Sequence, residues 1–100
     1  MAKRLKLHEE LLSFVNHAYF QPPENIKLEY PCIVYSRARG YETHADNRFY
    51  VGTRQYDLTL IERNPDSTVG EEIRLYFPMC TITNYYTADN LYHTKLNLYY

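Results

Sequence analysis

The stretch RQYDLTLIE, Arg54–Glu62, decides the fold of this chain. Tyr56, Leu58 and Leu60 alternate in it with polar residues. Because successive side chains of a β-strand point to opposite faces, this alternation predicts a strand with one buried and one polar face. The apolar, β-branched run Cys32–Arg37 precedes it, and we expect the two strands to pair antiparallel.

One helix is predicted before this strand pair and one after it. Residues 2–19 carry apolar side chains near one helical face, and two consecutive prolines then end the pattern. The second helix is expected after the turn residues Asn64–Ser67. Val69 and Ile73 begin its apolar stripe, and Pro78 closes it.

Two further strands complete the expected fold. Residues 79–87 and 91–100 are rich in Tyr and Thr, and the short polar link 88–90 between them suits a hairpin. The order α-β-β-α-β-β predicts an α+β fold with two helices on one face of a four-stranded, mainly antiparallel sheet. A long polar loop, residues 40–52, joins the first two strands, and residues 1–100 are expected to form one domain.

The composition excludes several classes of protein. The chain has 100 residues and a formal net charge of −1, so no global positive field draws it to nucleic acid or to an anionic membrane. No apolar run approaches the roughly 18 residues that span a bilayer. The N-terminus lacks the order of a secretory signal, so we expect synthesis in a cytoplasm and no membrane partner.

The residue types that serve in catalysis or metal binding do not occur at the spacings that such sites need. The four histidines lack the spacing of three or four that two metal ligands on one helix need. Cys32 and Cys80 lie in apolar strand-like runs, which favours buried free thiols over nucleophiles. The spacing of the acidic candidates brings no two of them together on one strand face: Asp46, Asp57, Glu62 and Asp66. The sequence therefore predicts no enzyme activity, no cofactor and no metal.

Tyrosine is the anomaly of the composition. The chain contains twelve Tyr and no Trp, which is more tyrosine than a core of this size can hide. Tyrosine joins a large apolar ring to a hydroxyl that needs a partner, so protein interfaces are enriched in it. A tyrosine-bearing sheet face is also how some single-strand nucleic-acid binders stack bases, with arginines holding the phosphates. That alternative stays open, although the slightly acidic charge and the lack of an aromatic RNA-binding motif count against it.

The long loop is the candidate interface. Loops beyond about 12 residues are uncommon in compact domains unless they bind something or become ordered on assembly. The loop and its flanks carry charged and amide side chains suited to hydrogen bonds between subunits: Arg39, Asp46, Asn47, Arg48 and Arg54.

Several segments together resemble a known family. In order along the chain these are Tyr19–Glu24 (YFQPPE), Leu28–Tyr35 (LEYPCIVY), Ala45–Asn47 (ADN), Tyr56–Ser67 (YDLTLIERNPDS), Tyr86–Leu91 (YTADNL) and Leu98–Tyr100 (LYY). Their order and spacing resemble the tail terminator, or tail completion, proteins of long-tailed bacteriophages, and the match spans about residues 4–100.

The resemblance implies a structural virion protein without catalytic residues. Proteins of this family cap the growing tail tube as a ring, usually of six copies, and later dock to the head connector. The implied partners are further copies of the chain, the tail tube protein and the head-completion or connector protein, with no specific nucleic acid. The implied location is the head–tail junction of the virion, after synthesis in the host bacterial cytoplasm.

Overall fold

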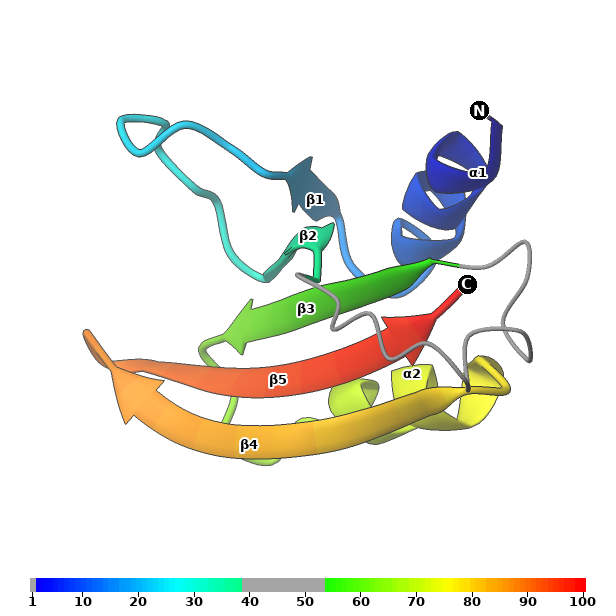
Figure 1. The fold of residues 1–100 in the computed structure, drawn as a ribbon. Helices are drawn as coiled ribbons and strands as arrows, with labels where there is room; N and C mark the ends of the chain where they lie inside the picture. Colours follow the sequence, from blue (N-terminus) through cyan, green and yellow to red (C-terminus); the bar gives the residue numbers. More distant parts are fainter. Residues whose placement is uncertain (1, 39–53) are drawn as a thin grey trace.

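The chain folds into two helices and a five-stranded mixed sheet. A computed structural model describes residues 2–38 and 54–100. Figure 1 shows the elements in chain order: α1 (Ala2–Leu11), β1 (His17–Phe20), β2 (Cys32–Arg37), β3 (Gln55–Glu62), α2 (Val69–Tyr76), β4 (Cys80–Ala88) and β5 (Leu91–Tyr99). The sheet order is β1-β2-β3-β5-β4. The α+β class is confirmed, but the prediction of four strands is wrong.

The missed strand is β1, which overlaps the end of the helix predicted over residues 2–19. The helix ends at Leu11 instead. The Ser13 hydroxyl donates to the carbonyl oxygen of Glu10 at 2.6 Å, and the Ser13 amide donates to the same oxygen at 3.1 Å. A serine side chain that competes for a helix carbonyl favours a turn, so the helix stops here. His17–Phe20 then pairs parallel with β2, with Ala18 opposite Ile33.

The predicted strand pairs are otherwise present. β2 and β3 pair antiparallel with Tyr35 opposite Leu58. β4 and β5 form a hairpin whose two turn residues, Asp89 and Asn90, have φ angles of 55° and 63°. Asp and Asn tolerate this left-handed backbone better than most residues, which explains their place in a two-residue hairpin turn. Most of the connection between β2 and β3, residues 39–53, lies outside the described residues.

Both helices contribute to one core on one face of the sheet. Leu7 and Leu11 of α1 and Ile73 of α2 are buried in one cluster with three residues of β3: Tyr56, Leu58 and Leu60. The other cluster members come from β2, β5 and the flanks of the helices: Val15, Ile33, Tyr35, Phe77, Leu96 and Leu98. Figure 1 shows α2 behind the β4–β5 part of the sheet. We call the sheet face opposite the helices the open face.

Helix α2 approaches β5 closely at its N-terminal end. A Cβ atom on Gly70 would lie 3.1 Å from the Cγ2 atom of Thr94, so glycine fits where a larger residue would push the helix away. This contact places the turn before α2 beside the β4–β5 hairpin. No helix in residues 2–38 and 54–100 is long and apolar enough to cross a membrane.

Candidate interaction surface

The structure describes one of the five interface residues predicted from sequence. Arg39, Asp46, Asn47 and Arg48 lie outside the described residues. Arg54 is described, and its side chain is exposed. Its amide and carbonyl exchange hydrogen bonds with those of Tyr100 at 3.1 and 2.9 Å, which extends the β3–β5 ladder by one residue pair. Arg54 therefore marks one end of the sheet.

In the part of the chain that the structure describes, the β4 edge, Cys80–Ala88, is the long open edge of the sheet. Its nine residues, CTITNYYTA, include no charged residue and no proline. β4 is the last strand in the sheet order, so β5 pairs with it on one side only. Edge strands of soluble monomers usually carry charges or proline because unpaired backbone groups attract other strands. β4 lacks both, whereas the opposite edge, β1, is only four residues long.

Large apolar side chains are exposed along the β4 edge. Leu75 and Tyr76 at the end of α2 are 71% and 55% exposed, and Tyr85 of β4 is 61% exposed. Met79 and Tyr86 are exposed as well. Tyr76 packs edge-to-face on Phe14, so the exposed aromatic side chains on the edge strand itself are those of Tyr85 and Tyr86, and such groups favour contacts with other proteins.

A β-bulge divides the edge strand. The pairing register shifts between Ile82 and Asn84, and the Thr83 hydroxyl donates to the carbonyl oxygen of Lys95 at 3.2 Å. Bulges bend an edge and so interrupt its pairing capacity. The five residues after it, Asn84–Ala88, remain a regular run in register with β5.

A pocket of about 260 Å³ adjoins this regular run. We call it the Glu62 pocket, because Glu62 at the end of β3 is 9% exposed and forms part of its lining. The Ser67 hydroxyl donates to Glu62 Oε2 at 2.6 Å, and the Val69 amide donates to Ser67 Oγ at 3.1 Å. These two bonds fold the 62–67 turn over the end of the sheet. Tyr85 and Tyr92 of the hairpin also line the pocket.

The open face carries a polar network rather than an apolar one. Gln55 donates to Asn97, and Asn97 donates to Asp57, both at 3.1 Å. Tyr86 stacks on His93 with ring centroids 4.6 Å apart and an interplanar angle of 14°. These bonds and stacking contacts fix side chains in place across β3, β5 and β4.

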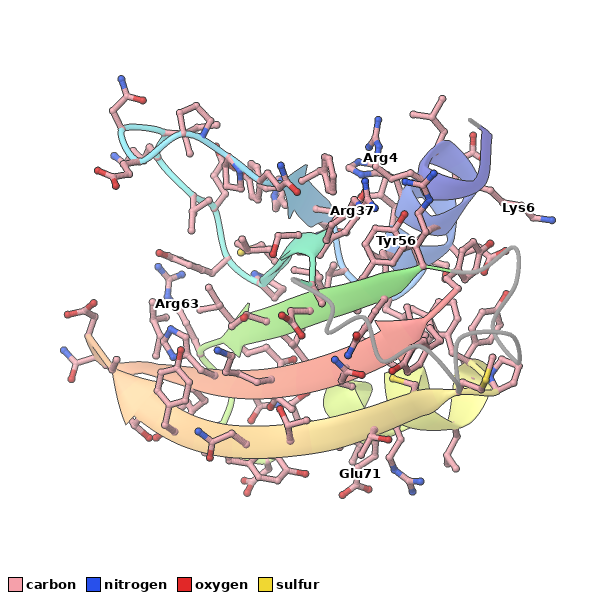
Figure 2. All side chains as sticks on the ribbon, in the orientation of Figure 1. Arg4, Lys6, Arg37, Tyr56, Arg63 and Glu71 are labelled. Carbon is pink, nitrogen blue, oxygen red and sulfur yellow. The ribbon has the colours of Figure 1, made fainter. Side chains whose placement is uncertain are left out.

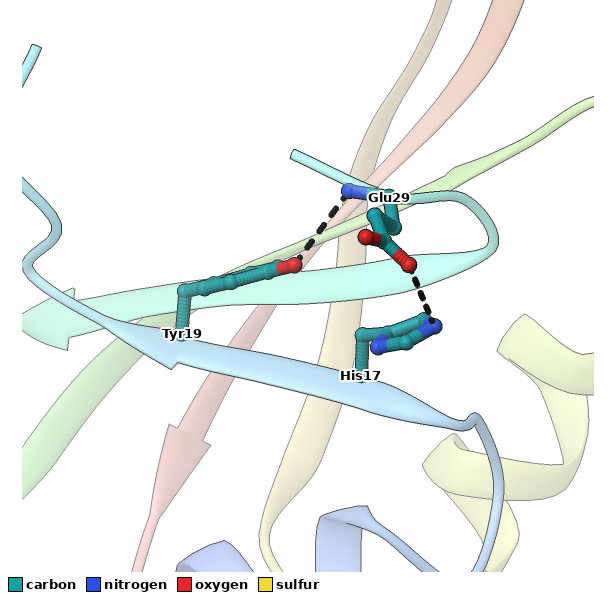
Figure 3. A network of polar contacts seen from close by, with 3 residues as sticks. All are labelled: His17, Tyr19 and Glu29. Carbon is teal, nitrogen blue, oxygen red and sulfur yellow. Dashed lines mark hydrogen bonds and ion pairs between the residues drawn. The ribbon is translucent and has the colours of Figure 1, made fainter. Parts of the chain in front are cut away.

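A second polar contact lies at the β1 end of the open face. His17 Nε2 lies 3.5 Å from Glu29 Oε1, and the Glu29 amide donates to the Tyr19 hydroxyl at 3.2 Å (Figure 3). These contacts hold the β1–β2 connection against the edge strand. The Tyr19 hydroxyl therefore has a partner within the molecule.

Both cysteines are free; Cys32 is buried and Cys80 is half-buried. Burial raises the pKa of the Cys32 thiol from 9.0 to about 11. Burial also raises the pKa of Cys80 to about 11, against a smaller lowering effect of Arg74. A thiol held neutral is a poor nucleophile. In the described part of the chain, no three His, Cys, Asp or Glu residues are grouped so that they could hold a metal ion.

The raised pKa of the Cys32 thiol predicts alkaline destabilisation. Between pH 9 and about pH 11 the folded chain keeps a thiol proton that the unfolded chain loses, so stability falls as pH rises through this window. Urea unfolding at pH 8, 9.5 and 10.5 should show a steady loss. Cys32→Ala should reduce the slope and leave the part that Cys80 contributes over the same window, and an unchanged slope in this variant would contradict the assignment to Cys32.

Comparison with known proteins found no matching family model, no similar curated protein and no similar solved structure. Sequence reasoning predicted the β4 strand but not its position at the edge, and it did not find the Glu62 pocket. The absence of charge from residues 80–88 was the available signal for the edge.

Proposed function

We propose that the chain is a structural subunit that works through contacts with other protein subunits, as a ring at the head–tail junction of a long-tailed bacteriophage. The β4 edge carries this proposal: among the described residues, these nine uncharged residues pair with β5 on one side only, and their Tyr85 and Tyr86 side chains are exposed. The phage assignment is supported by the family resemblance of the sequence segments. In this role the ring caps the tail tube and then joins the head connector.

A closed ring can be stable even where each contact between neighbouring subunits is modest. One heterologous interface repeated around an axis closes a ring, and each subunit then has two neighbours. Removing a subunit breaks two contacts at once, so a ring persists where an isolated pair would dissociate. A standard interface of about 800 Å² per partner is within reach of the β4 edge and the side chains beside it.

Single-strand nucleic-acid binding is the alternative, and Tyr19 and Tyr86 on the open face favour it. Against it, Asp57 shares this face with Lys95, so the face has no excess of positive charge there. Tyr86 is already stacked on His93. Titration of labelled RNA and DNA at low salt tests this alternative, because phosphate contacts strengthen as salt falls.

The direct test of the proposed function is the assembly state in and out of the virion. Purified protein should form closed rings by negative-stain microscopy and native mass spectrometry, alone or on addition of tail tubes. A phage with an early stop codon in the gene should make tails of irregular length beside unjoined full heads. Normal tails and normal infectivity in that mutant would refute the proposal.

A charge on the β4 edge should block assembly without unfolding the protein. Thr81 is exposed on β4 and does not line the Glu62 pocket, so Thr81→Lys places an ammonium group where a neighbour would have to desolvate it. We expect about a tenfold or greater loss of self-association by analytical ultracentrifugation. Asn25→Lys, an equal charge change at an exposed site in the β1–β2 connection, is the matched control. Equal assembly of both variants would contradict the role of the edge.

A further inference from the structure

Among residues 2–38 and 54–100, no cationic side chain pairs with the buried carboxylate of the Glu62 pocket. Glu62 is 9% exposed, and among the described residues the only hydrogen bond to its carboxylate comes from Ser67. A carboxylate has two oxygens and about four acceptor positions. Burying a charge is costly unless it is paired, so this carboxylate has unused capacity for a cation.

The rest of the lining also suits a cation. Tyr85 and Tyr92 line the pocket, whereas the Tyr86 ring already stacks on His93, and the described lining residues include no lysine and no arginine. Tyrosine faces attract ammonium and guanidinium groups within about 6 Å of the ring centroid. Arginine is favoured over lysine at such sites because its planar guanidinium both stacks on aromatic rings and binds a carboxylate through two hydrogen bonds.

The neighbouring arginine does not fill this role. Arg63 follows Glu62 directly, so its side chain leaves the strand on the opposite face. Its guanidinium lies 5.5 Å from the centroid of the Tyr30 ring. Arg63 is therefore directed to Tyr30 and away from the Glu62 carboxylate.

Exposed arginines without an acidic partner lie at the other end of the sheet. Arg37 is opposite Tyr56 in the β2–β3 register, and Arg54 precedes β3. Both side chains are exposed, and neither forms an ion pair among the described residues. Figure 2 shows Arg63 at one end of β3, with Arg37 and Tyr56 toward the other. Eight residues of strand separate Arg54 from Glu62, roughly 26 Å, which no arginine side chain can span.

We infer that the Glu62 pocket binds an arginine side chain from a second copy of this chain, supplied by its Arg37 or its Arg54. A basic end and an acidic pocket at opposite ends of one sheet match head to tail, which is the heterologous contact that closes a ring. The choice of a second copy rests on the proposed function. The chemistry of the pocket, a carboxylate beside tyrosines, does not.

The first measurement isolates the pocket from assembly. The ¹⁵N-labelled protein is titrated with N-acetylarginine amide, and N-acetylcitrulline amide serves as its uncharged analogue. Amides near the pocket, such as those of Ser67 and Thr94, should shift saturably, with citrulline weaker by about fivefold or more. Glu62→Gln keeps an acceptor for Ser67 and should weaken arginine binding by a similar factor. Equal binding of both probes, or no saturable shift, would overturn the pocket assignment.

The second measurement tests the source of the arginine. The Arg37→Gln/Arg54→Gln double variant and Glu62→Gln should each weaken self-association by about tenfold, and their combination should add little. Arg63→Gln is the charge-matched control at the pocket end and should leave self-association unchanged. If the pocket binds the arginine probe but the Arg37/Arg54 variant assembles normally, a second copy is refuted as the source. Rings would then still support the proposed function.

Discussion

Replacing Leu58 with alanine is expected to lower the free energy of unfolding by about 3 kcal/mol, a large part of the roughly 5–15 kcal/mol of a typical domain. Leu58 is fully buried at the centre of the sheet. It lies opposite Tyr35 of β2 on one side and Leu96 of β5 on the other. Truncation removes apolar contacts and leaves a cavity that neither neighbouring strand can close without breaking the ladder.

The expected measurement is a fall in melting temperature of about 12–24 °C by circular dichroism, with a parallel shift in the urea midpoint. Thr59→Ala is the matched control, because Thr59 is the next residue on the same strand and is half-buried on the open face. Its cost should stay below about 1 kcal/mol. Equal losses in the two variants would mean that β3 does not bury its even-numbered face.

Strand β3, which contains Leu58, was predictable because the sequence pattern that specifies it is local. Tyr56, Leu58 and Leu60 alternate with polar residues over one segment, and a period of two specifies a strand with one buried face. The second helix and the final hairpin were predictable for the same reason. Their turn residues and apolar spacing lie within a few positions of each other, so no knowledge of distant contacts was needed.

Strand β1 was not predictable in this way. It has four residues, all half-buried, so it shows no alternation. Its apolar residues also continue the helical spacing that begins in α1, and that spacing predicts a helix. The strand forms because β2 offers a parallel partner, with Tyr19 opposite Val34. A tertiary contact therefore overrides the local pattern.

The candidate site depended on sheet order, which no single segment encodes. Residues 80–88 read as a strand, but their edge position follows from β5 pairing with β3 as well as with β4. The sequence pattern places Glu62 only at the polar end of a strand. It becomes a pocket residue only because the Asn64–Ser67 turn folds back and Ser67 bonds to its carboxylate. Both features result from the order of pairing, which brings distant segments together.

Replacing Tyr35 with alanine should cost about 3–5 kcal/mol, because its ring joins α1 to the sheet. Tyr35 is fully buried, and its ring centroid lies 5.0 Å from that of Phe20 and 6.2 Å from that of Tyr56. Its hydroxyl lies 2.7 Å from Nδ1 of His8 on α1. Alanine removes the packing and the hydrogen bond together, so urea unfolding should show a much lower midpoint.

Tyr35→Phe separates the two contributions. It keeps the ring and removes the hydroxyl that contacts His8 and Arg4 of α1, so its cost should be about 1–2 kcal/mol, the net worth of one or two hydrogen bonds. Because these contacts connect α1 to β2, hydrogen exchange in Tyr35→Phe should quicken at the α1 amides more than at the β5 amides. Tyr19→Phe, which removes a surface hydroxyl bonded to the Glu29 amide, is the control and should leave α1 exchange unchanged. A phenylalanine variant as unstable as the alanine variant would show that the hydroxyl contacts, rather than ring packing, hold α1 on the sheet.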